Sequence, residues 1–184
     1  IMVVAGINAL IGGVMGMNQS RLRAIMAYSS IGHIGWMLSL LAVHKPNASI
    51  MYFLVYSTLI TPLFLLLNYF NISTIKHLNT SSSLNIASYA MLMVLLLSLG
   101  GLPPLTGFMP KFMTIMILTE YASITALTLI LGSLMNLFFY LSITINMMMS
   151  VSNLKTLLPT KSLSSNMVLT TATLSLGLSP LFLL

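Results

Sequence analysis

The 184 residues of this chain are 58% hydrophobic and only 4% charged, which excludes a soluble domain, because soluble domains carry roughly 25% charged residues. The net charge of +6 comes from basic residues that are scattered singly, so we expect no nucleic-acid binding and interpret these charges as topology signals. The absence of cysteine excludes disulfides and cysteine-bound metals or iron–sulfur clusters, and the three histidines and one glutamate are too dispersed to predict a metal site.

Apolar segments long enough to cross a bilayer follow one another along the sequence. A helix needs about 20 apolar residues to span the hydrocarbon, and about six segments approach that length. They run over residues 1–17, 24–43, 49–70, 84–119, 123–149 and 166–184. Polar linkers join them, and Ser20 lies where its side chain can cap the second helix. We therefore predict an all-α, polytopic transmembrane bundle without a separate soluble domain.

The segment 84–119 is too long for one regular span and contains Gly100-Gly101-Leu102-Pro103-Pro104 near its middle. Proline lacks a backbone N–H and disfavours helix in the residue before it, and glycine adds backbone freedom. The segment is therefore either a hairpin of two short spans or a single span that is discontinuous at residues 100–104.

The distribution of basic residues decides between these two topologies. If the segment 84–119 crosses once, one side of the membrane holds Arg21, Arg23, Lys76, Lys155 and Lys161, and the other side holds Lys45. If it crosses twice, Lys155 and Lys161 change sides and the excess disappears. Basic residues accumulate on the cytoplasmic or matrix side of membrane proteins. The sequence therefore favours a single, broken crossing with the richer side facing the cytoplasm or matrix.

Lys111 is the sharpest candidate for chemistry, because it lies inside an apolar segment a few residues after the two prolines. A charge at that depth is costly, but a broken helix offers free carbonyls and a hydrated gap that lower the cost. An amine that is partly removed from water can take up and release protons. The other interpretation is a lysine that extends to the membrane interface or braces the break without titrating.

His33 is a second candidate, in the middle of the segment 24–43, where Ser29 and Ser30 share its helical face. Imidazole titrates near neutral pH and can relay a proton, but a neutral histidine can equally hold neighbouring helices together. Asn136 and Tyr140, four residues apart on the segment 123–149, add polar groups that serve either a proton relay or helix–helix association.

No motif for covalent chemistry accompanies these residues. The sequence has no glycine-rich phosphate loop, no nucleophile motif, no carboxylate pair and no cofactor fingerprint. We therefore expect that this chain does not make or break covalent bonds in a substrate by itself.

Two stretches of the sequence carry a family resemblance. The first is residues 12–37, which include Ala27-Tyr28-Ser29-Ser30 and His33, and the second is Gly100-Gly101-Leu102-Pro103-Pro104-Leu105-Thr106-Gly107-Phe108-Met109-Pro110-Lys111. Together they resemble the antiporter-like membrane subunits of respiratory complex I, in particular the subunit 2 family of mitochondrial NADH dehydrogenase. The resemblance is specific over residues 12–112 and compositional beyond them.

This resemblance implies a core, non-redox subunit in the proton-pumping membrane arm of NADH:ubiquinone oxidoreductase, in the mitochondrial inner membrane. Lys111 matches the family's lysine on the second broken helix, and His33 matches its histidine. The implied organisation is a second five-helix repeat over residues 1–149 with a broken helix at 84–119, a loop at 150–165 and a terminal transmembrane helix at 166–184. The family's first repeat is missing, so we expect the chain to be about half of a usual member.

The same resemblance places cofactors on partner subunits. It implies that NADH, FMN, iron–sulfur clusters and ubiquinone bind elsewhere, and that this chain contacts other membrane-arm subunits, including neighbouring antiporter-like ones, and the lipid bilayer. Two alternatives stay open. One is a cation/proton antiporter fragment, which shares the broken-helix plan, and the other is a purely structural membrane subunit in which Lys111 only braces the helix break.

Overall fold

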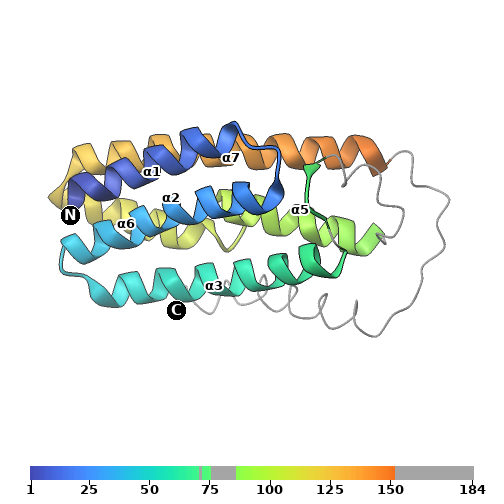
Figure 1. The fold of residues 1–184 in the computed structure, drawn as a ribbon. Helices are drawn as coiled ribbons and strands as arrows, with labels where there is room; N and C mark the ends of the chain where they lie inside the picture. Colours follow the sequence, from blue (N-terminus) through green and yellow to red (C-terminus); the bar gives the residue numbers. More distant parts are fainter. Residues whose placement is uncertain (71, 76–85, 152–184) are drawn as a thin grey trace.

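The computed structural model describes residues 1–70, 72–75 and 86–151, and its regular elements there are α-helices. They are α1 (Met2–Met17), α2 (Leu22–Ala42), α3 (Pro46–Tyr69), α5 (Ile86–Gly100), α6 (Phe108–Tyr121) and α7 (Ser123–Val151). The helices lie side by side along one direction and form an elongated bundle (Figure 1). The predicted all-α bundle is confirmed. The predicted helix 166–184, and the predicted loop beyond Val151, lie outside the described residues.

The outer surface of the bundle is that of a membrane protein. Within the described residues, α2, α3 and α7 are long and apolar enough to cross a membrane. Helix α1 and the part Ala90–Gly100 of α5 are apolar but shorter. Large hydrophobic side chains such as Phe53, Leu131 and Phe138 are more than half exposed. Exposing such an apolar surface to water is unfavourable, whereas exposing it to the hydrocarbon of a bilayer is not. The chain therefore spans a membrane.

Helix α1 packs against both α2 and α7 through small residues. A Cβ atom added to Gly12 of α1 would lie 2.6 Å from the carbonyl oxygen of Tyr28 on α2. A Cβ atom added to Gly132 of α7 would lie 2.5 Å from the carbonyl oxygen of Ala9 on α1. Close backbone approach is a main source of helix association in lipid, where the hydrophobic effect between helices is absent. The contacts of α1 therefore fix how α2 and α7 are placed beside each other.

Helices α5 and α6 form one crossing that is interrupted at residues 101–107. Figure 1 shows that α6 continues from α5 toward the same end of the bundle, and that α7 returns from that end. The irregular stretch begins at Gly101, where φ is +87°, and ends where Phe108 starts α6. The prediction of a single, discontinuous crossing is confirmed, and the stretch extends beyond the predicted residues 100–104 as far as Gly107.

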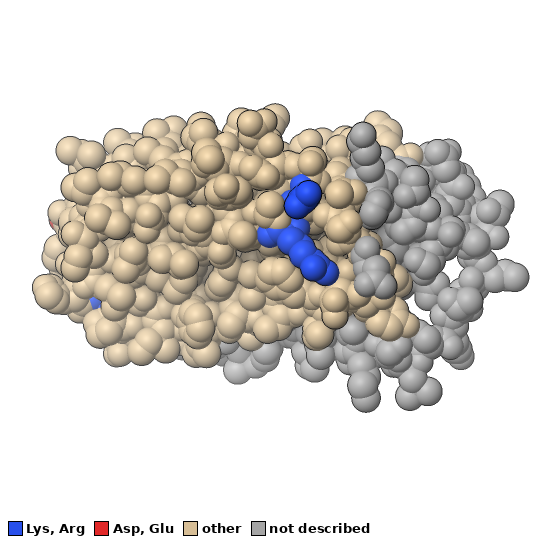
Figure 2. Space-filling model, viewed as in Figure 1, with Lys and Arg blue, Asp and Glu red and all other residues tan. Residues whose placement is uncertain are grey.

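On the face that Figure 2 shows, lysine and arginine side chains gather mainly in one patch, and most of the surface around it carries no charge. Arg21 and Arg23 are exposed at the start of α2, Lys45 is exposed just after α2, and Glu120 is exposed near the end of α6. Because Arg21 and Arg23 lie at the start of α2 and Lys45 follows its last turn, the two arginines and Lys45 lie at opposite ends of this helix (Figure 1). The remaining basic residues of the topology argument, Lys76, Lys155 and Lys161, lie outside the described residues.

The start of α2 differs from the sequence expectation. Arg21, rather than Ser20, is the N-cap residue, and it makes no side-chain cap hydrogen bond. The linker pairs instead with the segment after α3, because Leu22 N–H donates to the Ser73 carbonyl at 3.1 Å and Ile75 N–H donates to the Ser20 carbonyl at 3.2 Å. Backbone groups of the neighbouring segment therefore replace the side-chain cap, and the predicted capping role of Ser20 is wrong.

Candidate functional site

The break in the α5–α6 crossing starts with a Schellman motif at the end of α5. Leu102 N–H donates to the Leu97 carbonyl at 3.5 Å, and Gly101 N–H donates to the Ser98 carbonyl at 3.0 Å. This pair of bonds requires a left-handed residue after the helix, and Gly101 supplies it with its φ of +87°. The motif satisfies the carbonyls of Leu97 and Ser98 but leaves those of Leu99 and Gly100 without a backbone donor from the loop.

Lys111 provides the missing donors. Its Nζ donates to the Leu99 carbonyl at 3.1 Å and to the Gly100 carbonyl at 2.9 Å, and its side chain is only 6% exposed. The carbonyl end of a helix carries a partial negative charge that favours a cation. Glu120, the only acid in the sequence, lies nine positions further along α6, about 13 Å in helical rise. The charge of Lys111 is therefore balanced by helix carbonyls rather than by a carboxylate.

A second set of bonds closes the loop between the two half-helices. The hydroxyls of Ser98 and Thr106 lie 3.0 Å apart, and Gly107 N–H donates to the Ser98 Oγ at 3.2 Å. A Cβ atom at Gly107 would overlap the Ser98 carbonyl oxygen, so only glycine allows this close approach. Ser98, in the last turn of α5, thus holds the residue that precedes α6.

The sequence of α6 places Lys111 where it can reach back to α5. Phe108 is the first residue of α6 and Pro110 the third, and proline is tolerated there because the first N–H groups of a helix have no helical acceptor. Lys111 follows in the same turn, and the Cβ of a helical residue leans toward the helix N-terminus. The side chain of Lys111 is therefore directed toward the break.

His33 of α2 lies beside the break and contacts two tyrosines of α3, one of them through a hydrogen bond. Its Nδ1 lies 2.9 Å from the Tyr52 hydroxyl, and its ring centroid lies 4.7 Å from that of Tyr56. Its Nε2 is buried and has no hydrogen-bond partner among the described residues. A cavity of about 10 Å³ adjoins the ring, and its lining includes Leu99 and Gly107 of the break.

The four residues of the predicted polar relay are placed as follows. Ser29 and Ser30 each donate to a carbonyl of their own helix, at 2.9 Å and 2.6 Å. Asn136 of α7 lies against α2, because a Cβ atom at Gly32 would be 2.8 Å from its amide nitrogen. Tyr140 lies against the break, 3.7 Å from the position of a Cβ atom at Gly100.

Two buried polar atoms of α7 make no hydrogen bond within the geometric limits in the described part of the chain, namely Oδ1 of Asn136 and the hydroxyl of Tyr140. Lys111 and Tyr140 both lie at the end of α5, and Asn136 packs against α2, the helix that carries His33. The role of Asn136 and Tyr140 as relay residues stays a prediction.

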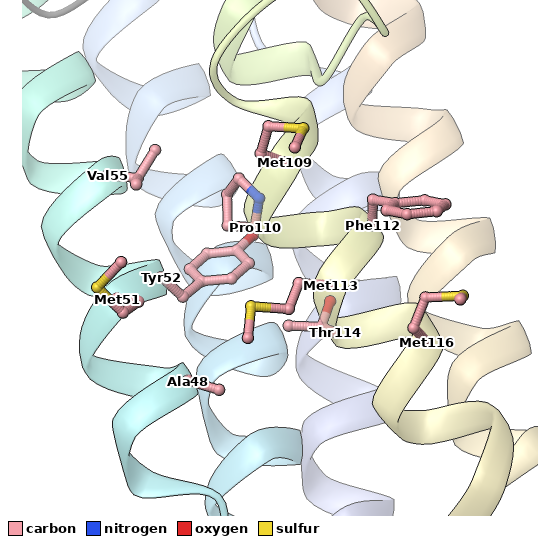
Figure 3. A pocket seen from close by; sticks show the side chains of 10 residues that line it. All are labelled: Ala48, Met51, Tyr52, Val55, Met109, Pro110, Phe112, Met113, Thr114 and Met116. Atoms are coloured by element: carbon pink, nitrogen blue, oxygen red, sulfur yellow. The ribbon is translucent and has the colours of Figure 1, made fainter. Parts of the chain in front are cut away.

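An apolar groove of about 340 Å³ separates α3 from α6 on the outside of the break (Figure 3). Its lining comprises Ala48, Met51, Tyr52, Val55, Met109, Pro110, Phe112, Met113, Thr114 and Met116. In Figure 3 the ring of Tyr52 extends from α3 toward Pro110 on α6. Tyr52 was not singled out by the sequence, yet it borders both this groove and the cavity at His33.

Comparison with known proteins gives a consistent set of matches. The family model described as NADH:quinone oxidoreductase/Mrp antiporter, TM, matches residues 1–136. NADH-ubiquinone oxidoreductase chain 2 of Lumbricus terrestris is 56% identical over 98% of this chain and 54% of its own length. The protein of that name from Sylvisorex granti is 39% identical over 96% of this chain and 53% of its own length. The chain therefore spans about half the length of the curated relatives it matches.

A solved structure shows the same fold. A chain of respiratory complex I from Thermus thermophilus with bound aureothin aligns with a TM-score of 0.80, over 97% of this chain and 42% of that chain. The sequence identity of 21% is too low to carry function, but the agreement extends over nearly all of this chain. The expectation that this sequence is about half of a family member agrees with the shares covered in all three matches.

Proposed function

Since this chain belongs to the NADH:quinone oxidoreductase/Mrp antiporter transmembrane family, we propose that it forms part of a proton path in the membrane arm of respiratory complex I. The relatives named NADH-ubiquinone oxidoreductase chain 2 support this assignment over almost the whole chain. The chain is then a non-redox subunit of an H⁺-translocating NADH:ubiquinone reductase. Its place is the mitochondrial inner membrane.

One observation carries the proposal, namely the buried amine of Lys111 bound to two helix-end carbonyls at the break. Burial in the membrane disfavours the charged amine, while the helix end and the two hydrogen bonds favour it. The two effects oppose each other, so modest changes in hydration or in nearby charge can shift the amine between its protonated and neutral forms. This is what a proton-transfer site needs.

His33 completes the proposed path on the α2 side. A cavity of about 10 Å³ beside its ring is at the lower limit for one water molecule, and its wall includes Leu99, whose carbonyl binds Lys111. An imidazole with one nitrogen unbonded can accept or donate a proton through such a water. We assign His33 the relay role and Lys111 the titrating role.

The remaining parts of the machinery belong to partner chains in this proposal. NADH, FMN, iron–sulfur clusters and ubiquinone bind there, and redox energy released there drives the proton step. The chain contacts other membrane-arm subunits, including neighbouring antiporter-like ones. Because it spans about half the length of its relatives, the upstream part of the proton path lies in the other half of the family's length.

The test replaces the amine in the assembled complex. We expect Lys111→Met to assemble but to lower proton pumping per electron by roughly tenfold or more, because an acid–base group is removed from the path. Lys111→Arg should also pump poorly, since guanidinium stays protonated. Lys45→Met, which removes an exposed lysine at the end of the bundle, is the matched control and should pump normally.

Proton uptake by liposomes that contain the purified complex gives the measurement. Normal pumping per electron in assembled Lys111→Met would refute the proposed role and favour a lysine that only braces the break. A cation/proton antiporter is the second candidate, because the matching family model includes the Mrp antiporters. Exchange of sodium or potassium for protons in vesicles without a redox partner would support that activity instead.

A further inference from the structure

The imidazole of His33 is held at one nitrogen and open at the other. The Tyr52 hydroxyl lies 2.9 Å from Nδ1, while Nε2 is buried and has no hydrogen-bond partner among the described residues. Both side chains are well buried, with His33 5% and Tyr52 2% exposed. A buried polar atom without a partner is costly, so its persistence points to a site where a proton or a water is exchanged.

The bond from Tyr52 decides which nitrogen is available. With Nδ1 occupied, Nε2 is the ring nitrogen left for exchange, and His33 lines the cavity of about 10 Å³. The ring of Tyr56 contacts the imidazole in a tilted arrangement, at a centroid distance of 4.7 Å and an interplanar angle of 36°. The hydrogen bond between the Tyr52 hydroxyl and Nδ1 limits rotation of the imidazole.

A phenol suits this position because its hydroxyl can both donate and accept a hydrogen bond. When Nδ1 is bare, the hydroxyl donates to it, and Nε2 of the neutral ring already carries the proton. When Nδ1 carries the proton, it donates a hydrogen bond to the hydroxyl, and Nε2 of the neutral ring is free to take up a second proton and to release it again. The Nδ1–H···O bond is then kept in both the neutral and the protonated ring while a proton passes through Nε2.

We propose that Tyr52 is the positioning residue of His33, holding the imidazole so that Nε2 serves the cavity at the helix break. The proposal rests on the relay role of His33 in the proposed function. In this proposal the Tyr52 hydroxyl keeps its own proton and takes no part in proton transfer. Tyr52 acts through the orientation of His33, as the hydrogen-bond partners of catalytic histidines do.

Besides the hydrogen bond of its hydroxyl, Tyr52 has an aromatic ring that helps to separate two spaces in the bundle. Tyr52 and Pro110 border both the cavity at His33 and the apolar groove between α3 and α6 (Figure 3). The two rings thus form part of the wall between the space beside His33 and the membrane-facing groove. Tyr52→Phe keeps this wall and removes only the hydrogen bond, so it isolates the positioning effect.

The experiment measures proton pumping by the assembled complex with Tyr52→Phe and, as a matched control, Tyr56→Phe. The control loses a hydroxyl from the other tyrosine at His33 and leaves the bond to Nδ1 intact. We expect Tyr52→Phe to lower kcat for coupled turnover by roughly three- to tenfold, the worth of one buried hydrogen bond, with KM for ubiquinone unchanged. Tyr56→Phe should stay within about twofold of the unmodified complex.

A double substitution separates positioning from structure. If Tyr52 acts through His33, the complex with both His33→Ala and Tyr52→Phe should pump no worse than the one with His33→Ala alone. Additive losses, unchanged kcat in Tyr52→Phe, or failure of Tyr52→Phe to assemble where Tyr56→Phe assembles would each overturn the proposal. Loss of pumping in Lys111→Met together with normal Tyr52→Phe would overturn this inference alone and leave the proposed function standing.

Discussion

The amine of Lys111 lies so close to Gly101 that a Cβ atom added there would be 2.9 Å from Nζ and 3.0 Å from Cδ. The lysine therefore occupies the space that a side chain at Gly101 would need. Two features require glycine at position 101: the lack of space for a side chain, and the φ of +87°, which disfavours any L-residue with a Cβ atom. The shape of the break and the placement of the amine depend on the same residue.

The first prediction concerns this residue. We expect Gly101→Ala to destabilise the chain by roughly 1–2 kcal/mol through its left-handed backbone alone. The added Cβ should also push the amine away from the carbonyls of Leu99 and Gly100, so proton pumping should fall together with the thermal unfolding midpoint in detergent. Both are measured on the assembled complex.

Gly100→Ala is the matched control, one residue earlier. A Cβ atom at Gly100 would meet Cδ2 of Tyr140 at 3.7 Å, an ordinary van der Waals distance. Gly100 is also the last residue of α5, where alanine is favoured over glycine. Gly100→Ala should therefore be nearly neutral. Equal effects of the two substitutions would contradict the role given to Gly101.

A second prediction concerns the bonds that join the two half-helices. Ser98→Ala removes the acceptor of Gly107 N–H and the partner of the Thr106 hydroxyl, both buried. Leaving such groups unpaired costs roughly 1–3 kcal/mol, so we expect a lower unfolding midpoint. The control is Ser39→Ala, since Ser39 is equally buried but donates only to the Trp36 carbonyl of its own helix. A smaller loss in Ser98→Ala than in Ser39→Ala would contradict this account.

The position of the break and the burial of Lys111 could be predicted from sequence because they depend on local chemistry. Two glycines followed by two prolines end a helix in any surroundings. The restart of the helix is harder to place from sequence, because Pro110 lacks a backbone N–H as the two earlier prolines do. It is tolerated as the third residue of α6, where its missing N–H has no helical acceptor to lose. The same rule starts α3 at Pro46, three residues before the predicted Ser49.

The partners of the candidate residues could not be predicted in this way. Tyr52 and His33 are 19 residues apart and meet only because α2 and α3 pack in one particular register. The sequence around Tyr52 carries no signal for that register, since one tyrosine among apolar residues fits a lipid-facing position equally well. Likewise, the approach of Asn136 to Gly32 depends on how α2 and α7 are placed in the bundle.

A third prediction follows from the packing of α1. Gly12→Ala would place a Cβ atom 2.6 Å from the Tyr28 carbonyl oxygen, a backbone atom that cannot move without moving α2. Overpacking of this kind costs roughly 1–3 kcal/mol, which outweighs the gain of about 1 kcal/mol in helix propensity. We expect a lower unfolding midpoint in detergent. Val14→Ala, on the exposed side of the same helix, should change the midpoint little, and the reverse order would refute close packing at Gly12.

The last prediction tests the single, broken crossing by cysteine labelling, which is direct here because the sequence contains no cysteine. Asn18 is exposed in the linker before α2, Asn47 is exposed in the first turn of α3, which follows α2, and Glu120 is exposed near the end of α6. If α5 and α6 make one crossing, Asn47→Cys and Glu120→Cys lie on the same side of the membrane. Asn18→Cys lies on the other.

A membrane-impermeant maleimide added to sealed vesicles of one orientation should therefore label Asn47→Cys and Glu120→Cys together, and Asn18→Cys only in the opposite orientation. After detergent dissolves the membrane, all three cysteine variants should react with the maleimide. This control shows that no partner subunit covers the cysteines in the assembled complex. A hairpin of two full spans would instead move Glu120→Cys to the side of Asn18→Cys. That labelling pattern would rule out the single, broken crossing, and with it the position of Lys111 inside the membrane.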